Sequence, residues 1–301
     1  MRVIDVDNLA EMSPFFRGKK GSRRAELFMK LFAIDKVNQI YHNSGHFTGS
    51  AFAASLLNDL GINYMIGNAE RLSRLPEGAF ITVANHPYGG LDGIILIDIL
   101  AGIRPDYKLM VNKLLSLVKT MKENFISVTP VFTRKKGITG TTIHGIRETI
   151  DSLNNGHPVG FFPSGAVSVF SLKNLRVRDR KWQTSILHLI HSMRIPVLPI
   201  RFFDANSTFF YFLGLINWKI RTLRMPGEIF NKREKKLRVG IGNLISVKEL
   251  EKYPDLASLG SFLRESVYKM PLPASFIPRN RLDLNLEKSL VNPNPDLNHL
   301  H

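Results

Sequence analysis

The feature that most constrains the fold is a regular alternation between short apolar segments and longer amphipathic ones. Runs such as 79–84 (AFITVA) and 159–162 (VGFF) are apolar apart from Thr82, which is typical of strands buried on both faces of a sheet. Between them apolar residues recur at helical spacing, as do Ile143, Ile146 and Ile150. This alternation predicts an α/β fold with a mainly parallel sheet flanked by helices. The expected strands are 79–84, 107–111, 125–132, 159–162, 196–203 and 237–245, and the expected helices are 24–41, 50–60, 91–100, 141–153, 182–193 and 256–269.

The chain divides into three segments of different character. Residues 1–70 are expected to form an N-terminal helical segment, because 24–41 and 50–60 both show helical periodicity. Residues 71–270 contain the alternating strands and helices and are expected to form the α/β domain. Residues 271–301 are rich in Pro and Asn, so we expect this C-terminal tail to wrap over the surface or fray.

The composition narrows both the chemistry and the location of the protein. None of the 301 residues is cysteine, which excludes disulfides, thiolate zinc sites and cysteine nucleophiles. The first seven residues include Arg2, Asp5 and Asp7, unlike the basic and then apolar pattern of a secretory signal. The sequence therefore predicts a protein on the cytoplasmic side of the membrane.

An excess of positive charge predicts an anionic partner. The chain has 41 Lys and Arg against 25 Asp and Glu, a net charge of +16, and the cations gather in 17–24, 173–181 and 219–238. Such a surface suits nucleic acid, anionic lipid headgroups or an acidic carrier protein, and it also occurs on proteins that use it only for solubility. Charge alone leaves these alternatives open. Nucleic-acid binding without catalysis is thus one alternative function, although no known nucleic-acid-binding motif accompanies the charge.

One apolar segment, 209–218 (FFYFLGLINW), is a possible membrane contact. It is too short to cross a bilayer, which requires about 20 mostly apolar residues. Aromatic residues lie at both of its ends and Lys219, Arg221 and Arg224 follow it, a pattern typical of segments that rest at the lipid headgroups. A helix buried in the core has similar apolarity, so both interpretations remain.

The loop after the predicted strand 79–84 places an imidazole and a carboxylate in one glycine-rich turn. It reads NHPYGGLDG and contains His86, Gly89, Gly90 and Asp92. In an open α/β sheet, ligands bind at the carboxyl ends of the strands, where this loop begins. A carboxylate that accepts one imidazole N–H fixes the tautomer and leaves the other ring nitrogen to take a proton. His86 is therefore a candidate general base that Asp92 orients, with a merely structural pair as the alternative.

The loop after the predicted strand 159–162 is the second unusual turn. It continues Phe162, Pro163, Ser164 and Gly165 and reaches Ser168. A serine-type lipid hydrolase with Ser164 as nucleophile is a further alternative, but the nucleophile elbow G-x-S-x-G lacks both of its glycines here. The Ser-Gly pair instead suits a backbone shaped for close approach to an oxyanion or a phosphate.

With both loops considered, the chain resembles the lysophospholipid/glycerophosphate acyltransferase superfamily, in its haemolysin-like bacterial branch that includes ornithine- and glycine-lipid O-acyltransferases. His86 and Asp92 match the family's first motif, and Arg134 falls where its second motif has an arginine. The third motif, commonly F-P-E-G-T-R-S, is matched by Phe162, Pro163, Gly165 and Ser168, and the fourth by the proline-containing strand around 197–200. The similarity extends over about 75–245.

The resemblance implies an acyltransferase-like fold and an O-acyltransferase reaction. His86, oriented by Asp92, would deprotonate a lysolipid hydroxyl that attacks the thioester of acyl-carrier protein or coenzyme A directly. Backbone N–H groups at Gly89–Gly90 or Ser164–Gly165 would stabilise the oxyanion. Arg134 would hold an acidic headgroup or the donor's phosphate. The resemblance implies no cofactor and no metal, and a peripheral enzyme on the cytoplasmic face of the inner membrane.

The chain also departs from the family pattern in two places. Five residues separate His86 from Asp92, one more than usual, and the glycine pair between them is expected to absorb the extra residue. The third-motif Glu is Ser164, and its Thr-Arg pair is Ala166-Val167. Because the family's charged residues there help to organise a glycerophosphate acceptor, their loss makes a lyso-aminolipid a plausible acceptor beside lysophosphatidic acid.

Overall fold

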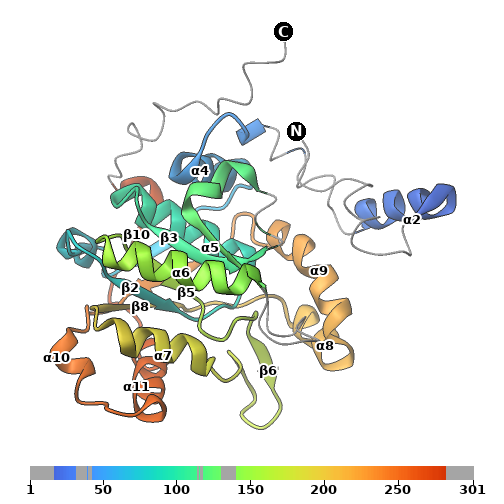
Figure 1. The fold of residues 1–301 in the computed structure, drawn as a ribbon. Coiled ribbons are helices and arrows are strands. Elements are labelled where there is room, and N and C mark those ends of the chain that lie inside the picture. Colours follow the sequence, from blue (N-terminus) through green and yellow to red (C-terminus); the bar gives the residue numbers. More distant parts are fainter. Residues whose placement is uncertain are drawn as a thin grey trace.

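The structure, a computed structural model, describes residues 17–31, 39, 43–113, 115, 118–129 and 140–282. An eight-stranded sheet forms its centre and helices lie on both faces (Figure 1). The strand order across the sheet is β10-β1-β9-β8-β2-β5-β3-β4. The strands are β1 (Met65–Gly67), β2 (Ile81–Ala84), β3 (Lys108–Asn112), β4 (Phe125–Val128), β5 (Val159–Phe161), β8 (Val197–Phe202), β9 (Arg238–Ile241) and β10 (Phe276–Pro278).

Most neighbouring strands run parallel, as predicted. β2 lies in the middle of the sheet and pairs in parallel with β8 on one side and β5 on the other. The β3–β5, β3–β4 and β1–β9 pairs are also parallel, whereas β8–β9 and β1–β10 are antiparallel. A separate antiparallel hairpin, β6 (Val169–Ser171) and β7 (Arg176–Arg178), projects from the body of the molecule (Figure 1). The α/β fold with a mainly parallel sheet is therefore confirmed.

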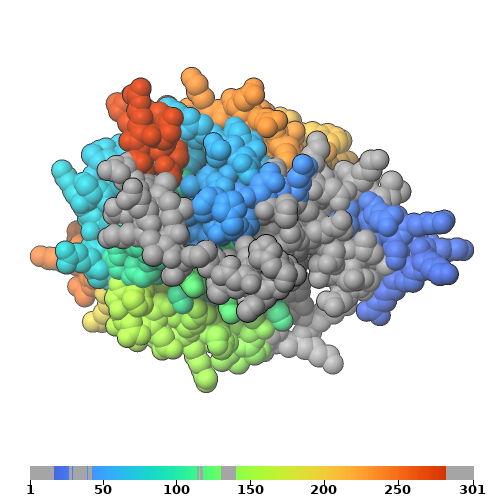
Figure 2. Space-filling model, turned by 90° about the horizontal axis from the view of Figure 1, so that it is seen from above, coloured from blue at the N-terminus to red at the C-terminus, as the bar shows by residue number. Residues whose placement is uncertain are grey.

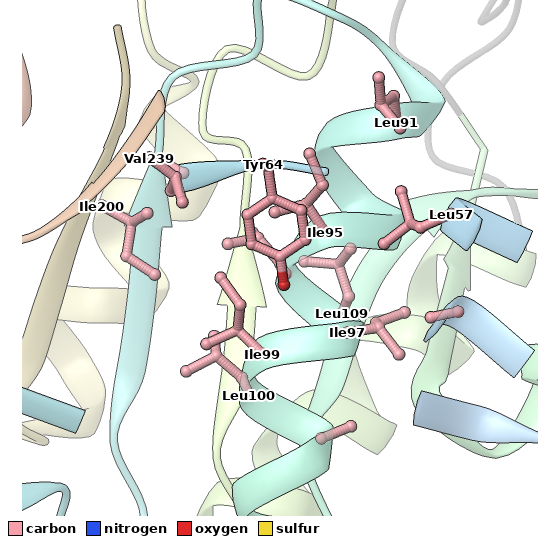
Figure 3. Packing of buried hydrophobic residues seen from close by; sticks show 14 of the residues in the cluster. Leu57, Tyr64, Leu91, Ile95, Ile97, Ile99, Leu100, Leu109, Ile200 and Val239 are labelled. Atoms are coloured by element: carbon pink, nitrogen blue, oxygen red, sulfur yellow. The ribbon is translucent and has the colours of Figure 1, made fainter. Parts of the chain in front are cut away.

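Helices cover the two faces of the sheet and bury separate apolar clusters. On one face Leu91 and Ile95 pack with Tyr64 and Leu109 (Figure 3). On the other face side chains of α7 and α11 pack on β2, β5 and β8. The helices are α2 (Gly18–Leu31), α4 (Gly49–Asp59), α5 (Gly90–Leu96), α6 (Gly140–Asn154), α7 (Thr184–Met193), α8 (Thr208–Ile216), α9 (Trp218–Phe230), α10 (Val247–Leu250) and α11 (Leu256–Tyr268), with the π-helical turn η3 (Ile97–Ala101) and the 3-10 turns η2 (Ala69–Arg74), η5 (Lys119–Asn124) and η7 (Arg279–Arg281).

The alternation of side chains along β2 explains why this strand can lie between two apolar layers. Ile81 and Val83 point to the cluster with α7 and α11, whereas Phe80 and Ala84 belong to the opposite cluster. All four residues of the strand are buried. Because successive side chains of a strand point to opposite faces, a fully apolar run is what a doubly covered strand requires.

Every predicted strand overlaps an observed one, and every predicted helix overlaps an observed helix. The helix expected at 24–41 corresponds in part to α2, and residues 32–38 lie outside the described part of the chain. The sequence did not predict β1, β6, β7 and β10, all of which have three residues. It also did not predict α8, α9 and α10. Strands this short carry too few residues to show a period of two.

The sheet extends beyond the interval 71–270 at both ends. β1 precedes this interval and β10 follows it, and the two pair with Ile66 opposite Ile277. In the space-filling view the last described residues, in red, pack against light-blue residues from near β1 (Figure 2). Just after β10, Arg279 forms a bidentate ion pair with the buried Asp98, at 2.6 and 2.7 Å, and Tyr64 donates to the same carboxylate. Residues 271–282 are thus fixed against the sheet, and 283–301 lie outside the described residues.

Candidate active site

The two unusual loops meet at one edge of the sheet. β2 and β5 are parallel neighbours, with Ile81 opposite Val159 and Val83 opposite Phe161, so the loops that follow them leave the sheet side by side. The His86 ring of the first loop stacks on the Phe162 ring of the second, with centroids 4.0 Å apart and planes 23° apart. The structure therefore brings together the two segments that the sequence singled out.

His86 and Asp92 form a close pair. His86 Nδ1 lies 2.9 Å from Asp92 Oδ2, and the histidine side chain remains 17% exposed while the aspartate is fully buried. Asp92 lies in the first turn of α5, where its Oδ2 also accepts the N–H groups of Tyr88 and Gly89 at 2.9 and 3.1 Å. The carboxylate thus caps its own helix and faces one nitrogen of the imidazole, leaving the other nitrogen at the far end of the ring.

The contact between the two side chains is short but not well aligned. Among the described residues neither His86 Nδ1 nor Asp92 Oδ1 has a partner with hydrogen-bond geometry. In unliganded enzymes catalytic hydrogen bonds are often poorly directed and tighten when substrate binds. Burial raises the pKa of Asp92 to about 6, against the opposing effects of His86 and of the two backbone N–H groups. The Asp92 carboxyl therefore exchanges its proton at a higher pH than an exposed aspartate does.

Gly89 lies in the turn between His86 and Asp92, where the sequence has one residue more than the family pattern. Its φ is +82°, a backbone conformation that favours glycine. A Cβ atom on Gly89 would also lie 2.6 Å from the sulfur of Met225, so the site has no room for a side chain. The conformation and the close approach of α9 both require glycine there.

In the second loop the Ser164 side chain forms a hydrogen bond within its own turn. Ser164 is buried, and its hydroxyl donates to the Ala166 carbonyl at 2.8 Å. No hydrogen bond between Ser164 and a histidine is present among the described residues, so the geometry does not support a serine nucleophile. Gly165 has φ +63°, and a Cβ atom there would overlap the Gln183 side chain.

Some of the backbone N–H groups considered for an oxyanion site are already engaged. The Gly165 N–H donates to the Phe162 carbonyl at 2.8 Å, and the Gly89 N–H donates to Asp92. The expectation that these two groups face a substrate is therefore wrong, because each of them closes its own turn. Within the described part of the chain, no hydrogen bond joins the backbone N–H of Gly90 or of Ser164 to a carbonyl outside the helices and strands.

Asp179 is a site residue that the sequence did not reveal. Its Oδ1 accepts the Ser168 hydroxyl at 2.5 Å and the His86 backbone N–H at 3.2 Å, and its Oδ2 accepts the Trp182 indole N–H at 3.3 Å. Ser168 N–H in turn donates to the His86 carbonyl. Asp179 therefore fastens the two loops to each other. The one visible signal was a lone acid in a basic run.

Helices α8 and α9 cover both loops from outside the sheet. The Tyr211 hydroxyl lies 3.3 Å from the Pro87 carbonyl, and Arg221 donates to the Ser168 carbonyl at 3.1 Å. Arg221 is almost fully buried, and burial lowers its pKa. These contacts place the helix pair directly beside His86.

The segment 209–218 is buried on one side and exposed on the other. Phe210 and Tyr211 are buried against Val167 in the second loop. Phe209 and Phe212 on the opposite side of α8 are 54% and 55% exposed. The segment also ends its first helix at Ile216, so Trp218 belongs to the next helix. Arg134, expected to hold an anionic group, lies outside the described residues.

Comparison with known proteins identifies the family. An acyltransferase family model matches residues 10–274. A lyso-glycine lipid O-acyltransferase of Bacteroides thetaiotaomicron is 26% identical over 89% of this chain and 97% of its own length, and one of Phocaeicola vulgatus is 25% identical over 89% and 95%. A solved structure of the 1-acyl-sn-glycerophosphate acyltransferase PlsC from Thermotoga maritima covers 82% of this chain and 95% of its own, with 13% identity and a TM-score of 0.44. Because the family model covers most of its length, the chain belongs to this acyltransferase family and is an enzyme of the acyltransferase type.

Proposed function

We propose that the enzyme transfers a fatty acyl group from a thioester to the hydroxyl of a lysolipid, with His86 as general base. The pairing of His86 with the buried Asp92 at the carboxyl edge of the sheet carries this proposal. The free ring nitrogen of His86 removes the hydroxyl proton while the oxygen attacks the thioester carbonyl. As the tetrahedral intermediate collapses, the C–S bond breaks and the proton passes to the thiolate. Asp92 holds the ring and stabilises the imidazolium that forms in between.

The acceptor that fits best is a lyso-aminolipid. Both curated relatives are named lyso-glycine lipid O-acyltransferases and match nearly the whole chain. The turn from Phe162 to Ser168 carries no charged residue, so it offers no ion pair to a glycerophosphate acceptor. The donor is acyl-carrier protein or coenzyme A, because the mechanism needs a thioester and the chain has no cysteine to form one of its own.

A direct assay tests the reaction. Purified enzyme is incubated with lyso-glycine lipid or lysophosphatidic acid and with acylated carrier protein or acyl-coenzyme A, and products are identified by mass spectrometry. We expect one added acyl chain per lyso-glycine lipid and release of the free thiol. Product from lysophosphatidic acid alone would contradict the assignment of the acceptor, and a hydrolysed thioester without acylated lipid would contradict acyl transfer.

Ser164→Ala is expected to keep most of the activity, within about threefold of wild type. The variant loses one hydrogen bond inside the turn. A hydrogen bond of this kind contributes about 0.5–1.5 kcal/mol to the free energy of unfolding. The measurement compares initial transfer rates and searches for an acyl adduct by intact-protein mass spectrometry. An acyl group trapped on Ser164, or activity lost in a folded variant, would restore the hydrolase-like mechanism.

The site lies beside an apolar surface suited to a bilayer, and we include membrane contact in the proposal. No helix in the described part of the chain has the length and apolarity to cross a membrane. On α8 and α9, however, large apolar side chains are exposed, and Arg224 and Lys219 lie among them. The apolar side chains are Phe209, Phe212, Leu215, Ile216, Trp218, Ile220 and Leu223, each at least 38% exposed.

This surface is suited to contact with anionic lipid headgroups, and the enzyme would bind them at the cytoplasmic face of the inner membrane. Aromatic and apolar side chains insert at headgroup depth, and cations beside them attract anionic lipid by about 1 kcal/mol each. The one acid of the two helices, Glu228, is buried and accepts hydrogen bonds from Ser207. A lipid substrate could thus reach His86 without leaving the interface, where each exposed CH₂ costs about 0.8 kcal/mol.

Replacing only the exposed residues tests this contact. We expect Phe209→Ser, Phe212→Ser and Ile216→Ser together to abolish sedimentation with phosphatidylglycerol-containing vesicles at an unchanged melting temperature. The matched control exchanges the distant exposed residues Ile143, Leu244 and Leu272 for Ser and should sediment like wild type. Equal sedimentation of the two triple variants would contradict the proposal. Phe210→Ser, in contrast, should lower the melting temperature, because Phe210 is fully buried.

A further inference from the structure

A second concave site lies next to the catalytic loops, between α7 and α11. It is an open cavity of about 480 Å³ whose floor includes Trp182 and Tyr268. Four cations line it, namely Arg178, Lys181, Arg264 and Lys269, and the one lining carboxylate, Glu265, is 3.0 Å from Lys269. The cavity therefore has a clear excess of positive charge.

Two of the cations share one aromatic ring. The Arg178 and Arg264 guanidinium groups lie 5.1 and 5.5 Å from the centre of the Tyr268 ring. Arg264 donates to the Asp179 carbonyl at 2.7 Å, and its buried Nε has no partner among the described residues. Burial lowers the pKa of the neighbouring Arg201, and the Arg178 guanidinium lowers it further. Cations held this close repel one another, and a bound anion would relieve that repulsion.

One residue connects the cavity to the catalytic histidine. The Asp179 backbone contacts two residues that line the cavity: its N–H donates to the Tyr268 hydroxyl at 2.7 Å, and its carbonyl accepts from Arg264. The Asp179 side chain holds the His86 N–H and the Ser168 hydroxyl. A ligand in the cavity is thus separated from the His86 loop by a single residue.

The cavity lies away from the apolar surface of α8 and α9. Figure 1 shows the hairpin of β6 and β7 between α11 and α8. A lipid that approaches along α8 and α9 would therefore reach His86 from one side, and the cationic cavity opens on another side. This arrangement favours the acyl donor over the lipid headgroup as the occupant of the cavity.

We propose that the cavity lined by Arg178, Lys181 and Arg264 binds the phosphate group of the donor's phosphopantetheine arm. The inference rests on the proposed function, because it assigns one of the two substrates. Both candidate donors present their thioester on this arm, and arginine pairs are well suited to phosphate oxygens. The phosphate would anchor the arm so that the thioester at its far end reaches His86.

Two probes that differ only in the phosphate test the inference by binding, independently of turnover. Isothermal titration should show that 4′-phosphopantetheine binds the full-length protein at least about tenfold more tightly than pantetheine. In Arg178→Gln/Lys181→Gln this difference should disappear, while Arg264 still holds the Asp179 carbonyl. Lys248→Gln, which removes an exposed cation on α10, should keep the difference.

The outcomes distinguish a donor phosphate from a lipid headgroup phosphate. They also distinguish phosphate binding in the cavity from the proposed acyl transfer. Equal binding of the two probes by wild type, or an unchanged preference in the double variant, overturns the inference. Loss of phosphatidylglycerol vesicle binding in the double variant, with the probe preference retained, would also overturn it and assign the cavity to a lipid headgroup. A phosphate preference that depends on both cations supports the inference even if no acyl transfer is detected, so the failure of one proposal is distinguishable from failure of the other.

Discussion

His86→Ala is expected to lower kcat/KM for acyl transfer by about 10²–10⁴-fold, the usual loss on removal of a general base. The fold should persist, because the side chain is partly exposed and its ring contact is with Phe162 alone among the described aromatic rings. Initial rates with saturating donor, together with thermal unfolding, measure both effects. His144→Ala is the matched control, since that histidine is exposed on α6. Near-normal turnover by a folded His86→Ala protein would eliminate the proposed mechanism.

Asp92 needs a gentler substitution, because it is fully buried and accepts two backbone N–H groups. Asp92→Asn keeps the shape and an acceptor oxygen but cannot stabilise the imidazolium, so we expect a loss of activity close to that of His86→Ala.

The raised pKa of Asp92, about 6, also predicts that wild-type kcat/KM falls as pH drops below about 6, where Asp92 becomes protonated.

The raised pKa of Asp92 also predicts that this carboxyl group favours folding less as the pH rises. The folded protein holds the Asp92 proton more tightly than the unfolded chain, whose value is near 3.8. The carboxyl group therefore favours folding at pH below about 4 and loses this contribution as pH rises through about 6. We expect Asp92→Asn to gain stability relative to wild type between pH 5 and 7. A stability difference that is constant over this range would contradict the raised pKa.

Asp179→Ala is expected to lower the free energy of unfolding by about 3 kcal/mol and to reduce kcat. It would leave the Ser168 hydroxyl, the Trp182 indole N–H and the His86 N–H without their acceptor, and a buried unsatisfied donor costs about 1–3 kcal/mol. Denaturant unfolding measures the stability. The loss of kcat follows because the two catalytic loops are no longer fastened to each other.

Two further variants separate positioning from general destabilisation. Asp179→Asn retains one acceptor oxygen and should recover part of both stability and kcat, with the KM for the donor nearly unchanged. Asp151→Ala removes an exposed carboxylate on α6 and should change the unfolding free energy by no more than about 0.5 kcal/mol. An Asp179→Ala protein that unfolds at the wild-type denaturant concentration would show that the network contributes nothing.

Local pattern was enough to predict the fold class and the close approach of His86 to Asp92. Apolar runs such as 79–84 and helical spacing such as 141–153 depend only on near neighbours along the chain. The His86 and Asp92 residues lie in a single loop, so their proximity also follows from local spacing. The sequence did not show that the second loop lies next to the first, because this depends on the pairing of β2 with β5 in the sheet.

Contacts between distant segments could not be predicted in this way. Asp179 is 93 residues from His86 along the chain, and Arg221 is 53 residues from the carbonyl it binds in Ser168. Its place as a lone acid in a basic run does not reveal the role of Asp179, because that role depends on a fold that brings the segment after β7 beside His86 and Ser168. The same holds for α8, where one face of an apolar helix is buried and the other is not.

The pairing of β1 with β10 has a consequence for how the chain acquires its structure during synthesis. The buried Asp98 is synthesised early, but its ion-pair partner Arg279 emerges from the ribosome about 180 residues later. Until then a buried carboxylate lacks its counterion, a state that costs several kcal/mol. The domain should therefore reach full stability only when the last strand has been translated, and a protein shortened to residue 270 would retain both catalytic loops but lose that stabilising ion pair.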